Sequence, residues 1–70
     1  MSAPTRDTVV TVAAAADFLA RQRAERHEIG ARHIVYKLPG ERWARTDAAR
    51  AGHVRLRLYA PANVCPCLGG

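Results

Sequence analysis

The sequence predicts an α+β domain: a small open mixed sheet of about three strands with one main helix packed on one face. Residues 8–12 are β-branched throughout, residues 13–28 are rich in helix formers, and residues 53–60 alternate between apolar and polar side chains. With 70 residues the chain forms one domain at most. Folding a chain of this size buries only about 60% of its extended-chain surface. We therefore do not expect an enclosed catalytic cleft.

The first half of the chain predicts a loose lead-in over residues 1–7, a short strand over residues 8–12 and then the helix. The helix is expected to span residues 13–28, with Gly30 as its C-terminal cap. Residues 13–20 are apolar on nearly every side, whereas the rest of the helix is polar all round. The front half is therefore expected to pack and the back half to project into solvent.

The second strand is predicted over residues 31–38, because an apolar segment there ends at the turn dipeptide Pro39-Gly40. Residues 41–45 are ambiguous. Residues 46–52 contain a cap-like threonine, an early aspartate and a closing glycine, and this pattern predicts one or two helical turns.

The clearest strand is predicted over residues 53–60. Its alternation sets apolar residues on one face and polar ones on the other, namely Val54, Leu56 and Leu58 against Arg55, Arg57 and Tyr59. Pro61 ends this strand, and residues 61–70 are expected to be a flexible tail. The predicted organisation is a lead-in (1–7), a single domain (8–60) and a tail (61–70).

The charge of the chain favours an anionic partner. Ten arginines and one lysine outnumber six carboxylates, which gives a net charge of +5 at pH 7. Two groups of residues are predicted to bind that partner: Lys37, Arg55, Arg57 and Tyr59 on one sheet face, and Arg21, Arg23 and Arg26 on the exposed half of the helix. The first hypothesis for function is therefore a small basic binding module for nucleic acid or an acidic protein surface.

We expect no enzymatic activity, because the chain has no nucleophile elbow, phosphate loop or paired-carboxylate spacing. It also has no apolar run long enough to span a membrane and no signal-peptide pattern at its start, so a cytoplasmic location is predicted. Large core residues are scarce beside the fourteen alanines. We therefore expect a homodimer, joined through a sheet edge or a surface that includes Phe18 and Trp43.

The C-terminal segment carries separate chemistry. Cys65 and Cys67 could bind Zn(II) or Cu(I) or form a redox pair, but two thiolates are half the ligands of a closed zinc site. No cofactor is therefore expected. Gly69 and Gly70 form an end without side chains, which can enter a narrow adenylating site.

The order helix, strand, Pro39-Gly40-Glu41-Arg42-Trp43-Ala44, the turn Gly52-His53-Val54 and the terminal Gly69-Gly70 resembles the ubiquitin-like sulfur carriers of thiamin and molybdopterin synthesis. The resemblance implies a β-grasp fold whose Gly70 is adenylated and converted to a thiocarboxylate. A sulfur carrier, or a thiol or metal shuttle acting through the tail, is thus the second hypothesis. The third is an accessory protein of a phage or mobile element that binds another protein.

Overall fold

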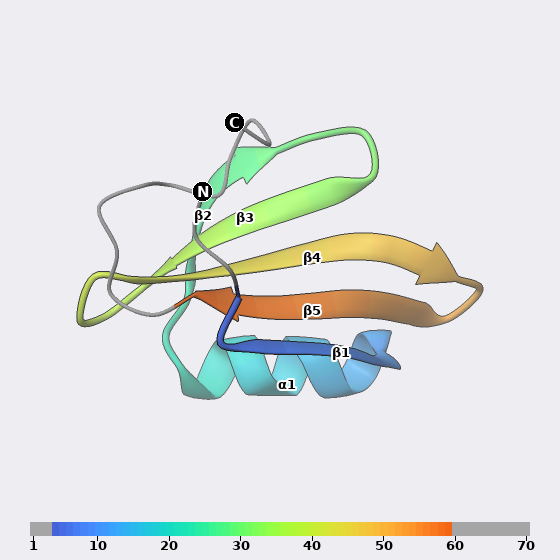
Figure 1. Cartoon of the computed structure of the whole chain (residues 1–70), viewed down its shortest axis with the longest axis horizontal. Coiled ribbons are helices and arrows are strands. Elements are labelled where there is room, and N and C mark those ends of the chain that lie inside the picture. Colours follow the sequence, from blue (N-terminus) through green and yellow to red (C-terminus); the bar gives the residue numbers. More distant parts are fainter. Residues whose placement is uncertain (1–3, 60–70) are drawn as a thin grey trace.

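The computed structural model describes residues 4–59 (Figure 1). The chain forms one five-stranded sheet and one helix. In chain order the elements are β1 (Arg6–Thr11), α1 (Val12–Arg21), β2 (Glu25–Ile29), β3 (His33–Leu38), β4 (Arg42–Arg50) and β5 (His53–Tyr59).

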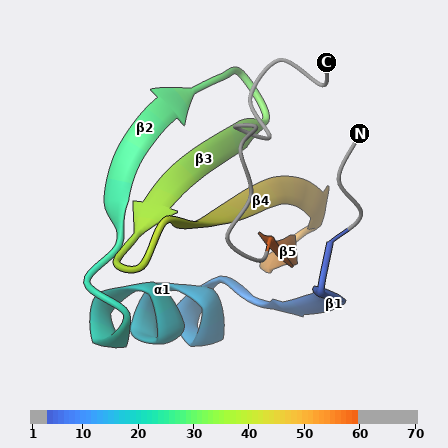
Figure 2. The same ribbon diagram turned by 60° about the vertical axis from the view of Figure 1, so that its left-hand side comes forward.

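The sheet has the strand order β1-β5-β4-β3-β2, and every neighbouring pair is antiparallel. Strands β2 to β5 form a meander, while β1 joins it beside β5. Helix α1 leads from β1 back to the other edge of the sheet and contacts β1 and β5 (Figures 1 and 2). Both sheet edges, β1 and β2, thus flank the same helix in sequence.

The predicted fold class was therefore wrong. Five antiparallel strands replace a mixed sheet of about three, and the helix has ten residues and covers only part of one face. The protein is mostly sheet rather than α+β with one main helix. The β-grasp fold implied by the resemblance opens with a hairpin before its helix, whereas within residues 4–59 only β1 precedes α1.

Helix α1 ends earlier than predicted because the chain reverses at Arg23. The Arg23 N–H donates to the carbonyl of Ala20, and the Ala24 N–H donates to that of Leu19, with Arg23 at φ 56°. This pair of hydrogen bonds is a Schellman cap, in which glycine usually occupies the left-handed position. The polar residues after it are then free to form a strand instead of a second helical half.

Replacing Arg23 with glycine is expected to raise the free energy of unfolding by about 0.5–1 kcal/mol, because glycine adopts a positive φ without strain. Arg21→Gly is the control, since Arg21 is the last residue of the helix, does not have a positive φ, and glycine there should cost up to about 1 kcal/mol. Urea denaturation of both variants measures the two effects. A loss of stability in Arg23→Gly would show that the arginine side chain matters more than the backbone strain.

The residues after the cap form the edge strand β2, which pairs with β3 and carries a bulge between Arg26 and Glu28. Gly30, predicted to cap the helix, instead lies in the turn between β2 and β3, where its N–H donates to the carbonyl of His33. A Cβ atom at Gly30 would lie 2.2 Å from the His33 ring. A larger residue at this position would require the His33 ring to move.

Strand β4 replaces the helical turns predicted over residues 46–52. It pairs with β3 on one side and with β5 on the other, so its backbone groups are satisfied by two neighbours. Gly52, predicted to close those turns, has φ +74° in the tight β4–β5 connection. Strand pairing from both sides thus outweighs the local helical signals.

The hydrophobic core lies between α1 and the sheet. Val35 is fully buried on the other side of the sheet, opposite Arg45. The buried residues on the helix side are Leu19, Leu38, Ala44 and Leu56, with Val10, Phe18, Ala24, Tyr36 and Leu58 packed around them. Phe18 is therefore on the helix side of the sheet, whereas Trp43 alternates with Ala44 and points to the other side. These two aromatic residues do not share the single surface predicted for a dimer contact. In residues 4–59 no helix is long and apolar enough to cross a membrane.

Candidate functional site

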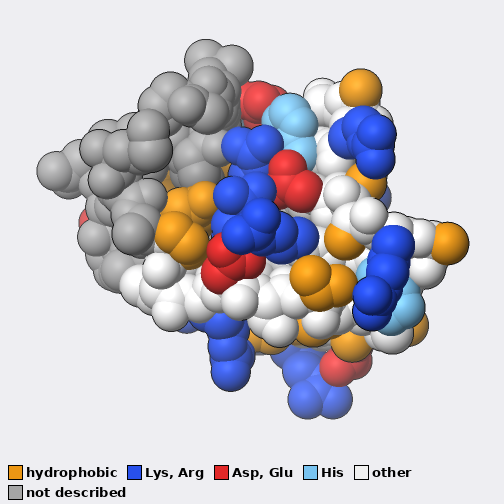
Figure 3. Space-filling view, turned by 45° about the vertical axis from the view of Figure 1, so that its right-hand side comes forward, with side chains coloured by type: hydrophobic (Ala, Val, Ile, Leu, Met, Phe, Trp, Pro, Cys, Tyr) orange, Lys and Arg blue, Asp and Glu red, His pale blue; other side chains and the backbone are white. Residues whose placement is uncertain are grey.

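The sheet face directed away from α1 carries most of the chemistry of the described residues. Because side chains alternate along a strand, residues next to the buried Leu38, Ala44 and Leu56 project to this side. We call it the charged face and define it by Asp7, Val9, Glu25, His27, Glu28, His33, Val35, Lys37, Trp43, Arg45, Asp47, Arg55, Arg57 and Tyr59. Figure 3 shows basic side chains gathered in a band, with acidic side chains set among them.

One cross-strand row of this face is aromatic and basic. Tyr59 of β5 lies opposite Trp43 of β4, and Trp43 lies opposite Lys37 of β3. The ring of His27, from the β2 bulge, meets the Trp43 ring edge-on at a centroid distance of 4.8 Å and an interplanar angle of 72°. This edge-to-face geometry is favourable for aromatic pairs and fixes the orientation of the indole.

The neighbouring row is held together by one carboxylate. Arg57 and Arg45 lie directly opposite each other on β5 and β4. Asp47 accepts hydrogen bonds from Arg45 Nε at 3.0 and 3.2 Å and from Arg45 Nη2 at 3.0 Å. It also accepts one from Arg57 Nη2 at 2.7 Å. Asp47 therefore neutralises part of the repulsion between two arginines that the sheet forces together.

A second carboxylate orients the third arginine. Asp7 of β1 accepts from Arg55 Nε at 2.7 Å and from Arg55 Nη2 at 2.5 Å, which is a bidentate pair between the edge strand and β5. Three guanidinium groups thus share two carboxylates, so this cluster keeps a net charge of +1. The arginine side chains are held in defined positions and still present positive charge.

The electrostatics of the cluster favour the ionised forms of Asp47, Asp7 and Arg55. Partial burial alone would raise the pKa of Asp47, but the hydrogen bonds from Arg45 and Arg57 outweigh it and lower the pKa below its usual 3.8. The Arg55 hydrogen bonds likewise lower the pKa of Asp7. The same pair raises the pKa of the Arg55 guanidinium.

Arg57 has donor capacity that the fold leaves unused. Its Nε is buried and has no hydrogen-bond partner among the described residues. A buried N–H without an acceptor is costly, by roughly 1–3 kcal/mol, and such groups are rare in folded proteins.

The structure separates the two predicted basic groups. Lys37, Arg55, Arg57 and Tyr59 lie on the charged face, as their alternation implied. The predicted stripe of arginines along the helix does not exist. Arg21 ends α1 and pairs with Asp17, Arg23 lies in the capping turn, and Arg26 lies on β2 opposite Tyr36, on the helix side of the sheet.

Sequence reasoning missed Trp43, Arg45, Asp47, Asp7 and His27 as members of this face. A signal for three of them is present, because Trp43, Arg45 and Asp47 alternate with small residues at the core positions of β4. The cap-like pattern over residues 46–52 indicated helical turns instead of a strand, so this alternation was not recognised. Nothing local indicates that His27 meets Trp43, since the contact depends on the pairing of β2 with β3.

The tail residues Cys65, Cys67, Gly69 and Gly70 lie outside the described residues, so the hypotheses about them stay predictions. Within residues 4–59 no group of three or more His, Cys, Asp or Glu side chains is arranged to hold a metal ion. The one acidic partner of a described histidine ring is Glu28, whose Oε1 lies 3.1 Å from Nε2 of His33.

Comparison with known proteins gives no relative. No family model matches the chain, and neither a curated protein nor a solved structure shows significant similarity to it.

Proposed function

We propose that this protein is a small non-enzymatic module that binds single-stranded nucleic acid on the charged face. The observation that carries the proposal is the adjacency of two rows. Tyr59 and Trp43 lie side by side in one row, and Arg57 and Arg45 lie in the next. Rows of this kind offer stacking surfaces for bases beside donors for phosphates.

The arginines are suited to phosphate contact because the carboxylates hold them in place. Asp47 on β4 accepts a hydrogen bond from Arg57 on β5, and Asp7 on the edge strand β1 accepts one from Arg55 on β5. These contacts hold both guanidinium groups in place. A side chain that is already ordered loses less rotamer entropy when it meets a ligand.

The aromatic row favours nucleic acid over an acidic protein as the partner. An acidic protein surface would be drawn to the arginines but would gain little from Tyr59 and Trp43. Bases gain from both, since aromatic stacking is worth about 1–3 kcal/mol for each base. A single strand is favoured over a duplex, because only unpaired bases can reach rings that lie on a sheet surface.

The test is a fluorescence anisotropy titration of labelled single-stranded oligonucleotides at salt concentrations from about 50 to about 200 mM. The wild-type protein should lose affinity steeply as salt rises, through counterion release. Lys37→Gln and Arg55→Gln should each weaken binding roughly three- to ten-fold for every sequence and reduce the salt slope by about 0.7.

Arg21→Gln is the matched control, because it removes the same charge from the exposed end of α1. It should change affinity less than about two-fold, since only its long-range charge is lost. Equal losses in the control and in the charged-face variants would mean that net charge alone drives binding. An affinity that does not change with salt concentration would overturn the proposal. Tighter binding to an acidic protein than to the oligonucleotides would show that the partner is a protein.

A further inference from the structure

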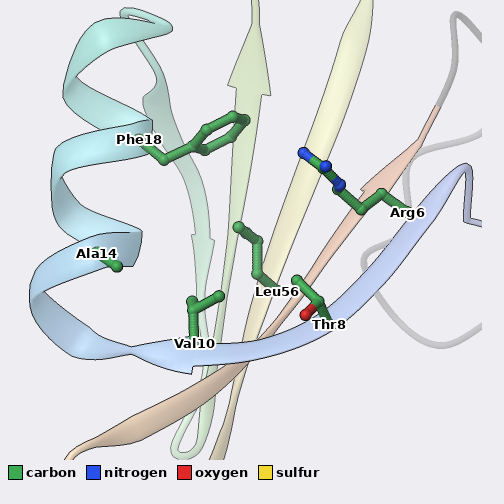
Figure 4. A pocket seen from close by; sticks show the side chains of 6 residues that line it. All are labelled: Arg6, Thr8, Val10, Ala14, Phe18 and Leu56. Carbon is green, nitrogen blue, oxygen red and sulfur yellow. The ribbon is translucent and has the colours of Figure 1, made fainter.

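A groove of about 330 Å³ opens between β1 and α1, on the sheet face opposite the charged face. Val10, Ala14, Phe18 and Leu56 form its apolar lining, and Arg6 and Thr8 of β1 complete it (Figure 4). Its volume lies at the lower end of the range of small-molecule sites.

The groove exists because of where the sequence places small side chains. Ala14 is one turn from Phe18 on α1, so the helix presents a methyl group where a larger residue would fill the gap. On the opposite wall β1 supplies Thr8 and Arg6 in place of apolar residues. Phe18 and Val10 consequently stay only half-buried, with apolar surface available to a ligand.

Arg6 supplies an uncompensated charge at this groove. Figure 4 shows its side chain directed across the gap toward Phe18. Among the described residues Arg6 has no hydrogen bond or ion pair from its guanidinium, whereas Arg55 and Arg57 pair with Asp7 and Asp47. An apolar lining with one cation and one hydroxyl beside it matches a molecule with an apolar chain and an anionic head.

We propose that this groove binds a medium-chain carboxylate from solution. The alkyl chain lies against Phe18, Val10 and Leu56, and the carboxylate accepts hydrogen bonds from the Arg6 guanidinium. The Thr8 hydroxyl is a second donor on the same wall. This site is independent of the proposed nucleic-acid interface, because the two lie on opposite faces of the sheet.

The experiment is an NMR titration of the labelled full-length protein with decanoate, octanoate and hexanoate, each below its micelle concentration. Backbone amide shifts should move for the residues that line the groove and not for those of the charged face. Affinity should rise roughly two- to four-fold for each added methylene group. Decanol, which has the same chain without the charge, should bind more weakly.

Variants separate the head group from the chain. Arg6→Gln should weaken decanoate binding roughly five-fold or more and leave decanol binding unchanged, because only the charge-assisted hydrogen bonds are lost. Arg50→Gln, which removes an exposed arginine at the end of β4, is the control and should leave decanoate affinity unchanged. Ala14→Leu should fill the groove and weaken both ligands, whereas Ala16→Leu, on the exposed side of α1, should weaken neither.

Two results would overturn the proposal. Shift changes that map to the charged face, or equal losses in Arg6→Gln and Arg50→Gln, would show general attraction of an anion to a basic protein. Decanol binding as tightly as decanoate would show that Arg6 plays no part in recognition.

Discussion

Replacing Asp47 with asparagine is expected to lower the free energy of unfolding by about 2 kcal/mol. The substitution keeps the shape of the side chain and removes its charge. Arg45 and Arg57, with 19% and 24% of their side chains exposed, then face each other across β4 and β5 without the carboxylate between them. Like charges directly opposite in a sheet destabilise it, and partial burial weakens the screening by water.

Chemical denaturation of Asp47→Asn, Arg57→Gln and the double variant measures this effect as a double-mutant cycle. The double variant should recover part of the stability lost in Asp47→Asn, since one of the two repelling charges is gone. Asp7→Asn is the control and should cost less, because the Asp7–Arg55 pair is more exposed. Stability unchanged in Asp47→Asn would show that this carboxylate does not organise the arginines.

The same pair of aspartates gives a signed pH dependence. The folded pKa values of Asp47 and Asp7 lie below the unfolded ones, so the folded state binds fewer protons in acid. Their contribution to stability is complete above the usual carboxyl pKa of 3.8 and is lost as the pH falls through the lowered folded values. The urea concentration at the denaturation midpoint of the wild type should therefore decrease as the pH is lowered below about 4. The midpoint of Asp47→Asn should decrease less over the same pH range.

Replacing Trp43 with alanine is expected to weaken single-stranded nucleic-acid binding roughly 10- to 100-fold, because one base loses its stacking partner. The salt slope should stay unchanged, since no phosphate contact is removed. Trp43→Phe should retain most of the affinity, because it keeps an aromatic face. Anisotropy titrations of both variants measure the two effects.

The wild-type protein supplies an internal check on this prediction. Trp43 is the only tryptophan of the chain, so its fluorescence reports on the charged face without a label. Saturating oligonucleotide should quench that emission if a base stacks on the indole. Unchanged emission, or a loss of salt slope in Trp43→Ala, would place the ligand elsewhere. An amide fingerprint spectrum of each variant confirms that it remains folded.

Three strands could be predicted from the sequence with nearly correct bounds. Strand β1 (Arg6–Thr11) was predicted at residues 8–12. Strand β5 (His53–Tyr59) was predicted at residues 53–60, and β3 (His33–Leu38) at residues 31–38. In β5 strict alternation marks one buried face and one polar face, and in β3 an apolar segment ends at a turn dipeptide. Such signals depend only on residues that are neighbours in the sequence, so they indicate a strand without knowledge of its pairing partners.

Strands β2 and β4 could not be predicted, because their conformation depends on distant partners. The residues of β2 are polar and suit a helix, but the reversal at Arg23 makes them an edge strand against β3. Asp47 resembled an early helical residue, and its role appears only when β4 pairs with β5 and brings it to Arg57. Propensity is a weak guide wherever pairing decides the outcome.

For the candidate site, the sequence by itself determined that Arg55, Arg57 and Tyr59 share a face and that the chain is basic, because alternation and composition need no partner. Only the tertiary structure decided that Trp43 stands beside Tyr59 and that Asp47 joins two arginines. It also decided that Arg6 borders an apolar groove. The physical reason is that a strand sets the direction of its side chains locally, whereas their neighbours are set by the order and register of the other strands.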